Sequence, residues 1–273
     1  MKKMRIGIIG GGNMGEALIK GLHAKHHIYV FEASEPRIKY LKKKYPVIIV
    51  GDLKTIQMAS VIILAVKPQD MQAAFLWIRS DDSREDKLFI SIAAGLPTKY
   101  FENLIKNIVL QPKPRVVRAM PNMPALINEG VTGICKGEYA SKTDLKTAQK
   151  ILSTIGQTVI VKESMMDAVT AVSGSGPGYV FLFVEQWIAA AVSLGFSKDI
   201  AMRLVVGTLI GSAHLMRKAN FTVRDLLDLR KKVTSKGGTT QAAMDVFFNE
   251  NIFGNLIKKA LEAAQERAKE LSK

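Results

Sequence analysis

The sequence predicts an α/β domain followed by an all-α domain. Up to about residue 163, short β-rich runs alternate with amphipathic helical runs, and after that residue only helical patterns continue. The β-rich runs are continuous Ile, Val and Leu, which is typical of a largely parallel sheet covered by helices on both faces. We therefore expect one domain over residues 1–163 and a second over 164–273.

Each expected element follows from its pattern of apolar residues and its flanking turn residues. The strands are expected at Arg5–Ile9, Ile28–Phe31, Val47–Val50, Val61–Val66, Leu88–Ile92, Val116–Met120, Val131–Cys135 and Val159–Val161. The helices of the first domain are expected at Asn13–Leu22, Pro36–Lys44, Gln69–Arg79, Pro97–Lys106 and Ser141–Thr154. Those of the second are expected at Tyr179–Leu194, Ser197–Lys218, Thr222–Lys232, Thr240–Asn249 and Ile252–Leu271, with Ser197 and Thr222 as N-caps.

One of these helices indicates an oligomer. The segment 179–191 is apolar almost all round, and a helical domain of about 110 residues could not easily bury it alone. We expect a homodimer in which a second subunit covers part of this helix. The alternative is a helix at the centre of its own domain.

Composition sets broad limits on function. The 273 residues are 48% hydrophobic, which is enough for a full core and excludes an intrinsically disordered chain. A single cysteine, Cys135, excludes an intramolecular disulfide framework and a Cys-clustered zinc site. The net charge of +15 favours an anionic partner, but it does not choose among nucleic acid, acidic membrane and phosphorylated small molecules.

The sequence predicts a cytoplasmic protein without a membrane segment. The longest apolar stretch, 179–191, is interrupted by Glu185 and Gln186 and is shorter than the roughly 18 residues of a spanning helix. The apolar run after the basic start is too short for a signal peptide, and no small-residue cleavage site follows it.

The strongest local motif is a glycine-rich turn at the start of the chain. Gly10, Gly12 and Gly15 form G-x-G-x-x-G between the first expected strand and the first expected helix. This pattern suits a tight turn, close approach of the backbone to a pyrophosphate, and close packing of helix on strand. We expect dinucleotide binding in a Rossmann-type domain, against the alternative of a purely structural turn.

The sequence contains features that favour NADH and features that favour NADPH. Glu32 follows the second expected strand, and a carboxylate there can accept both ribose hydroxyls of NADH while repelling a 2′-phosphate. Arg37, Lys39 and Lys42–Lys44 follow closely and could attract that phosphate instead, although a lysine run of this kind is more often a solvated helix face.

Further motifs make the sequence similar to a known family. They are Ala65-Val66-Lys67-Pro68, Arg118-Ala119-Met120-Pro121-Asn122, Ser173-Gly174-Ser175-Gly176-Pro177-Gly178-Tyr179 and Val233-Thr234-Ser235-Lys236-Gly237-Gly238-Thr239-Thr240. Together with the glycine turn they resemble pyrroline-5-carboxylate reductase, in order and over nearly the whole chain. The resemblance implies a Rossmann domain, an all-α dimerisation domain whose dimers often assemble further, and reduction of Δ1-pyrroline-5-carboxylate to L-proline by NADPH or NADH.

The resemblance also implies which residues contact the ligands. The implied nucleotide contacts are Gly10, Gly11, Gly12, Asn13, Met14, Glu32, Ser34, Asp52, Ala65, Val66, Lys67, Pro68, Ile92 and Ala94. The implied substrate contacts are Glu163, Ser235, Gly238, Thr239 and Thr240. The Thr240 hydroxyl is the expected catalytic group, through a hydrogen bond to the ring nitrogen; without the resemblance it would read as a simple N-cap.

The chemistry of the residues is compatible with this assignment. An iminium is already electrophilic, so its reduction needs an aligned hydride donor but no histidine or metal ion. The loop Ser235–Thr240 offers backbone N–H groups and hydroxyls at the start of a helix, which can hold a carboxylate. No metal site is expected. Cys135 lies inside an apolar strand and is expected in the core.

The sequence departs from the family pattern at Glu32, Asp52, Gly178, Lys232 and Lys236, and two of these positions bear most on ligand binding. Lys236 stands where the family usually has proline, which loosens the loop and adds a cation beside the expected carboxylate site. Glu32 replaces the small or polar residues of NADPH-preferring members, which leaves the cofactor preference undecided.

Two other functions are considered. Another two-domain NAD(P)-dependent imine reductase or 3-hydroxyacid dehydrogenase would share the first domain, but the latter relies on a catalytic lysine and lacks T-S-x-G-G-T-T. A non-catalytic basic protein that binds nucleic acid or a partner is supported by net charge alone, because the sequence has no nucleic-acid-recognition signature.

Overall fold

The computed structural model describes residues 3–50, 55–78, 87–108, 111–218 and 222–271. The chain forms two compact units: unit 1 is Met1–Pro177 with Ala263–Lys273, and unit 2 is Gly178–Glu262. Residues 164–177, which the sequence places with the helical domain, therefore pack with unit 1. The domain boundary at residue 163 stays a prediction.

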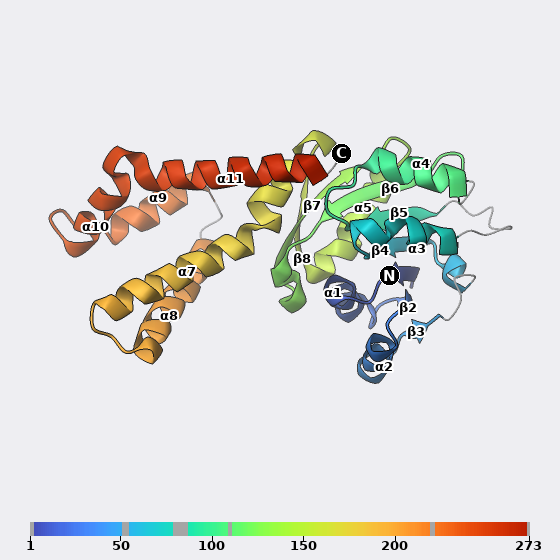
Figure 1. Ribbon diagram of the computed structural model, residues 1–273, viewed down its shortest axis with the longest axis horizontal. Coiled ribbons are helices and arrows are strands. Elements are labelled where there is room, and N and C mark those ends of the chain that lie inside the picture. The colour runs from blue at the N-terminus through green and yellow to red at the C-terminus, as the bar shows by residue number, and fades with distance from the viewer. Residues whose placement is uncertain (1–2, 51–54, 79–86, 109–110, 219–221, 272–273) are drawn as a thin grey trace. The chain divides into compact units, whose positions relative to one another are not determined.

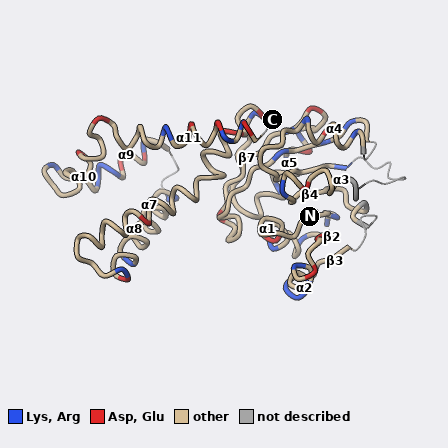
Figure 2. Tube along the Cα trace, viewed as in Figure 1, with Lys and Arg blue, Asp and Glu red and all other residues tan. Residues whose placement is uncertain are grey.

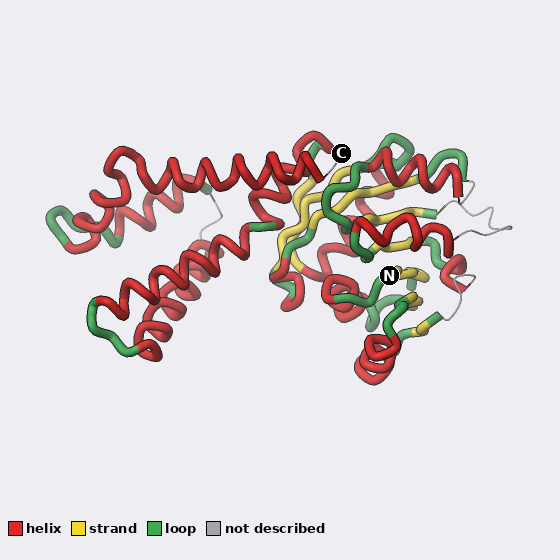
Figure 3. The backbone as a smooth tube through the Cα atoms, viewed as in Figure 1, coloured by secondary structure: helices red, strands yellow, loops and turns green. Residues whose placement is uncertain are grey.

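Unit 1 is built on an eight-stranded sheet in the order β3-β2-β1-β4-β5-β6-β7-β8 (Figures 1 and 3). Its strands are β1 (Arg5–Ile9), β2 (His27–Phe31), β3 (Ile48–Ile49), β4 (Val61–Leu64), β5 (Leu88–Ser91), β6 (Arg115–Met120), β7 (Gly130–Lys136) and β8 (Gly156–Ile160). The order reverses between β1 and β4, which is the point of a doubly wound sheet where ligands bind. The predicted Rossmann-type α/β domain is confirmed.

Helices cover both faces of this sheet, as the continuous apolar strands predict. They are α1 (Asn13–Leu22), α2 (Glu35–Lys44), α3 (Met71–Ile78), α4 (Thr98–Ile108), α5 (Lys142–Leu152) and α6 (Met166–Val169). Alternate residues of β4 enter different cores: Ile63 packs in a cluster with α1 and α5 residues, and Ile62 in a cluster with Phe75 of α3 and Phe101 of α4. Both faces of the sheet are therefore buried at its central strands.

One strand pair departs from the parallel arrangement. β7 runs antiparallel to β6, with Arg118 opposite Cys135, while β7 and β8 are parallel again. The connection between β6 and β7 carries only a short helical turn, Met123–Ile127, and antiparallel neighbours can be joined without a full crossover helix. Cys135 is buried in β7, as expected, and burial, followed by the nearby Glu163 carboxylate, raises the pKa of its thiol to about 12.

Unit 2 is helical. The helices of this region are α7 (Gly176–Ser193), α8 (Lys198–Lys218), α9 (Val223–Lys232), α10 (Thr239–Phe248) and α11 (Ile252–Leu271), of which α7 and α11 extend into the sequence of unit 1. The expected N-cap Thr222 is confirmed: it accepts from the Asp225 N–H and forms a capping box with it. Ser197 accepts from the Ile200 N–H at 3.4 Å, a weaker cap.

The helices of unit 2 bury little of their apolar surface. Their buried cluster consists of Ala191, Ala201 and Val205, with partly buried neighbours. On α7, Phe181 and Leu182 are each 56% exposed, and on α8, Leu204 and Ile210 are each 50% exposed. Much of the apolar surface of segment 179–191 is therefore exposed in the single chain.

The helix α8 also has the length and apolar composition of a membrane-spanning helix, with 11% of its most apolar window buried. Helices that associate with another protein surface satisfy the same two criteria. Length and composition therefore do not by themselves distinguish a membrane contact from a protein contact at α8.

Candidate functional site

The glycine-rich turn connects β1 to α1 and requires glycine at two of its positions. Gly10 has φ +98°, and a Cβ there would lie 2.6 Å from the Ala65 carbonyl oxygen. A Cβ on Gly15 would lie 2.1 Å from the carbonyl oxygen of Gly10. The turn is further fixed by the Gly10 N–H, which donates to the Phe31 carbonyl at 2.8 Å. The close packing expected of this motif is confirmed.

Gly12 serves a different purpose, since a Cβ there would meet nothing within 4 Å. It is the N-cap of α1, and no side chain caps this helix end. The first N–H groups of a helix lack intrahelical partners, and the helix dipole favours an anion beside them. The chemistry of this end therefore fits the pyrophosphate of a dinucleotide.

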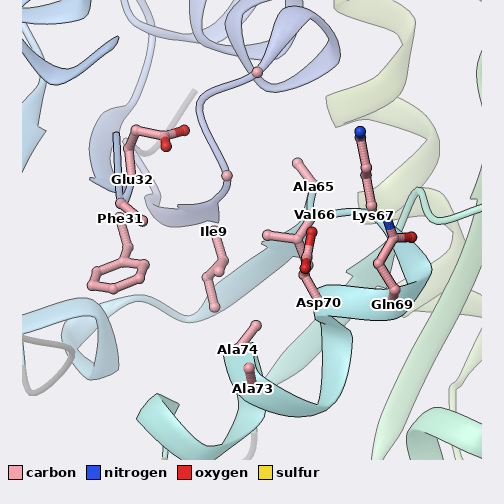
Figure 4. Close-up of a pocket in the computed structure, with 13 residues that line it drawn as sticks. Ile9, Phe31, Glu32, Ala65, Val66, Lys67, Gln69, Asp70, Ala73 and Ala74 are labelled. Carbon is pink, nitrogen blue, oxygen red and sulfur yellow. The ribbon is translucent and has the colours of Figure 1, made fainter. Parts of the chain in front are cut away.

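A cavity of about 510 Å³ lies beside the turn (Figure 4). It is lined by Ile9, Gly10, Gly12, Phe31, Glu32, Ala33, Ala65, Val66, Lys67, Gln69, Asp70, Ala73 and Ala74. In Figure 4, Phe31 and Glu32 form one side and the segment around Val66 to Asp70 the other. The cavity is thus at the carboxyl ends of β1, β2 and β4.

Six of the expected nucleotide contacts line this cavity, namely Gly10, Gly12, Glu32, Ala65, Val66 and Lys67. The expected contacts Gly11, Asn13 and Met14 belong to the turn and the first turn of α1, and Pro68 begins the short helix after Lys67. Ile92 and Ala94 follow β5, where the Ile92 N–H donates to the Leu64 carbonyl. Asp52 lies outside the described residues. The nucleotide roles of all these residues stay predictions.

Glu32 is held in place by the backbone on both sides. Its carboxylate accepts from the Gly11 N–H at 2.7 Å and from the Ser34 N–H at 2.8 Å. Ser34 is therefore a partner of Glu32 and the N-cap of α2. These two bonds fix the carboxylate at the end of β2, at the rim of the cavity.

Sequence reasoning missed the far wall of the cavity. Gln69 and Asp70 come from the short helix after β4, and Ala73 and Ala74 from α3. The small side chains of the two alanines leave room beside the turn. The predicted fold could have indicated these residues. In a doubly wound sheet, the ligand cavity is lined by the segments that follow the strands on either side of the point where the strand order reverses.

The expected substrate loop lies in unit 2, between α9 and α10. Gly237 has φ +71°, and Gly238 is the N-cap of α10 with no side-chain cap. The Gly238 N–H donates to the Ser235 carbonyl at 3.0 Å, so this group, expected to face substrate, is used within the loop. The first N–H groups of α10 and the half-buried Thr240 hydroxyl remain as donors.

Glu163 is placed in a network inside unit 1. Its carboxylate accepts from the Thr98 N–H at 3.0 Å and from the Thr98 hydroxyl at 2.6 Å. Arg118, whose side chain is 5% exposed, donates to Glu163 at 3.1 Å and pairs with Asp167 at 3.5 Å. Glu163 thus joins the N-terminus of α4 to β6, which sequence reasoning did not find because these partners are far apart in the chain.

Within the described parts of the chain, no group of three or more His, Cys, Asp and Glu side chains is placed to hold a metal ion. The fold and the site define a Rossmann-type dinucleotide-binding oxidoreductase. Residues 5–95 match the family model described as NADP oxidoreductase, coenzyme F420-dependent, and residues 163–271 match the model described as pyrroline-5-carboxylate reductase dimerisation.

Comparison with known proteins gives the particular family. The chain is 36% identical to the pyrroline-5-carboxylate reductase of Pseudomonas aeruginosa, over 100% of this chain and 98% of that protein. The solved pyrroline-5-carboxylate reductase of Coxiella burnetii superposes with a TM-score of 0.90 at 35% identity, covering 100% of both chains. The Plasmodium falciparum pyrroline carboxylate reductase, solved with NADP bound, superposes with a TM-score of 0.78 at 28% identity, again over 100% of both chains. The chain belongs to the pyrroline-5-carboxylate reductase family.

Proposed function

We propose that this chain reduces Δ1-pyrroline-5-carboxylate to L-proline with hydride from NADH or NADPH, the final step of proline biosynthesis. The observation that carries the proposal is similarity to pyrroline-5-carboxylate reductases over the whole chain, in a structure that keeps the glycine turn. The glycine turn and the loop before α10, both present in this chain, support the same reaction.

Unit 1 is assigned to the nucleotide, which supplies the hydride when bound. The open N-terminus of α1 holds the pyrophosphate, and Glu32 faces the adenosine ribose. Lys67 adds a positive charge at the cavity rim and presents its backbone to the phosphates. Asn13, Met14, Ile92, Ala94 and Asp52 are retained as proposed contacts.

Unit 2 is assigned to the substrate carboxylate and ring nitrogen. The uncapped N-terminus of α10, with Ser235, Gly238 and Thr239, forms the carboxylate site. The Thr240 hydroxyl forms a hydrogen bond to the ring nitrogen and orients the C=N bond. Glu163, whose oxygens are committed to Thr98 and Arg118, is assigned to holding α4 on β6 rather than to the substrate.

The functional assembly is proposed to be a homodimer in the cytoplasm, with further association of dimers. The match of residues 163–271 to a dimerisation domain supports an oligomer, as does the exposed apolar surface of α7 and α8. That partner surface also accounts for the apolar composition of α8 without a membrane, and no nucleic-acid partner is proposed.

The first experiment is an assay of the purified protein with pyrroline-5-carboxylate and each nucleotide, followed by product analysis. Proline formation is expected. Absence of proline with both nucleotides would refute the proposal and leave another imine or a 3-hydroxyacid as the substrate to be tried.

The Thr240→Ala variant tests the catalytic assignment. We expect kcat/KM for the imine to fall about 100-fold, the usual range for a positioned proton donor, while nucleotide affinity is unchanged. Thr234→Ala is the matched control, because the Thr234 hydroxyl is committed to the Arg230 carbonyl at 2.8 Å. Equal activity of the two variants would remove Thr240 from the reaction.

A further inference from the structure

Two residues of opposite charge contact the same residue of the glycine turn. The Gly11 N–H donates to Glu32, and the Gly11 carbonyl accepts from the Nε of Arg37 at 2.5 Å. Arg37 and the Glu32 carboxylate, which lines the cavity, therefore bind the same residue, Gly11. By position, it is the cation of α2 best placed to meet a 2′-phosphate on an adenosine ribose at Glu32.

Arg37 is nevertheless engaged elsewhere. Its terminal guanidinium nitrogen pairs with the carboxylate of Glu16 on α1, and its side chain is 24% exposed. Lys44, at the other end of α2, binds the same carboxylate at 2.9 Å. Figure 2 shows the basic positions of α2, whose acidic residue, Glu35, lies in its first turn. Two of its cations are thus directed toward α1.

The Glu16 carboxylate is the centre of a cluster formed by Glu16, Arg37, Tyr40, Lys44 and Tyr45. Besides the two cations, it accepts from the Tyr40 hydroxyl at 2.9 Å and from the Tyr45 hydroxyl at 3.0 Å. Tyr40 also lies under both cations, with the Arg37 Cζ and the Lys44 Nζ each 4.9 Å from its ring centroid. The cluster fixes both basic side chains by several contacts each.

The charge state of Glu16 is stable at neutral pH. Burial alone would raise its pKa, but the hydrogen bonds from Lys44, Tyr40, Arg37 and Tyr45 outweigh burial and lower the pKa to about 2. Its negative charge therefore compensates the cations at neutral pH.

We propose that Glu16 is a cofactor-specificity residue: it retains Arg37 and Lys44 on α1 while Glu32 occupies the ribose position, so that the chain selects NADH over NADPH. The inference rests on the proposed function and concerns the nucleotide that this function uses. It differs from a preference set by Glu32 alone, because the cations that could neutralise Glu32 are present and are held by a second carboxylate. The solved relative with NADP bound makes NADPH the competing expectation.

The test is direct measurement of dissociation constants for NADH and NADPH by nucleotide fluorescence, with no substrate present. Wild type is expected to bind NADH at least tenfold more tightly. Glu32→Ser should strengthen NADPH binding. Adding Glu16→Gln, which keeps the shape of the side chain but removes its charge, should strengthen NADPH binding by about a further tenfold and leave NADH within twofold.

Two variants keep this result interpretable. Glu35→Gln makes the same change in net charge on an exposed residue paired with Lys39, and in the Glu32→Ser background it should not change NADPH affinity. Arg37→Gln added to the Glu32→Ser/Glu16→Gln double variant should remove the gain in NADPH binding, which tests the cation that the loss of the Glu16 charge releases. Circular dichroism of each variant verifies folding.

Tighter wild-type binding of NADPH than of NADH would overturn the inference. The inference would also be overturned if the Glu32→Ser/Glu16→Gln double variant bound NADPH no better than Glu32→Ser does. Glu16 would then only join α1 to α2. Either result leaves proline formation untouched, so it is distinguishable from failure of the proposed reaction.

Discussion

Unit 1 buries most of its large apolar side chains in its own cores, whereas unit 2 leaves most of its large apolar side chains exposed. In unit 1, alternate residues of each central strand enter two dry cores, and Phe75, Phe89 and Phe101 are fully buried. In unit 2, the buried cluster is small and Phe181 and Leu182 face outward. The difference is the reason why an additional surface is proposed for unit 2, whereas the central sheet of unit 1 is covered by its own helices.

Substitution in the core of unit 1 should give the largest effect. Phe75→Ala removes a ring that packs near Phe89 and Phe101, with centroid distances of 6.0 and 6.5 Å. Urea unfolding should show a loss of about 3–5 kcal/mol. The loss should be the same at every protein concentration, and a concentration-dependent loss would contradict the self-contained core.

A charge on α7 should act through assembly instead. Phe181→Glu is expected to weaken self-association by about 2 kcal/mol, roughly thirtyfold, because it places a carboxylate on the surface that the proposed homodimer covers. Analytical ultracentrifugation measures the change. The control is Ile127→Glu in unit 1, at an apolar position that is 68% exposed, compared with 56% for Phe181. Equal dissociation by both variants would show that the two units do not differ in this respect.

The smallest effect concerns the link between α1 and α2. Because the folded-state pKa of Glu16 is lowered from 4.5 to about 2, its stabilisation is complete above its unfolded pKa and is lost as pH falls through the range from 4.5 to 2. Glu16→Gln should cost about 1 kcal/mol at pH 7 after allowance for partial exposure of the pair. The difference from wild type should shrink below pH 4.5, as followed by urea unfolding, and a pH-independent difference would contradict the assigned charge.

The sequence predicted the elements whose causes are local. Continuous apolar strands, the glycine turn and the Thr222 cap depend on neighbouring residues, and each was found within a few residues of its expected place. The antiparallel β7, the links from Glu16 to α2 and the Thr98–Glu163–Arg118 network depend on partners 13 to 65 positions apart. No period or motif encodes such pairs, so only the folded chain reveals them.

The same limit applies to the candidate site. The glycine turn was predicted from its own motif, and the resemblance supplied the Lys67 region and the loop before α10; all three are local in the sequence. It could not show that the Gly238 N–H is used by Ser235, or that the carboxylate of Glu163 is engaged by Arg118. Residues that act through tertiary contacts were either missed or given a different role.

The reactivity of the buried Cys135 thiol can be used to measure how often the sheet of unit 1 opens. It is the single cysteine of the chain, it lies in β7 between two other strands, and its pKa of about 12 leaves almost no thiolate at neutral pH. A thiol reagent can react only when this part of the sheet opens. The labelling rate therefore reports the opening of the sheet in the native enzyme, and bound nucleotide should slow it if the nucleotide stabilises unit 1.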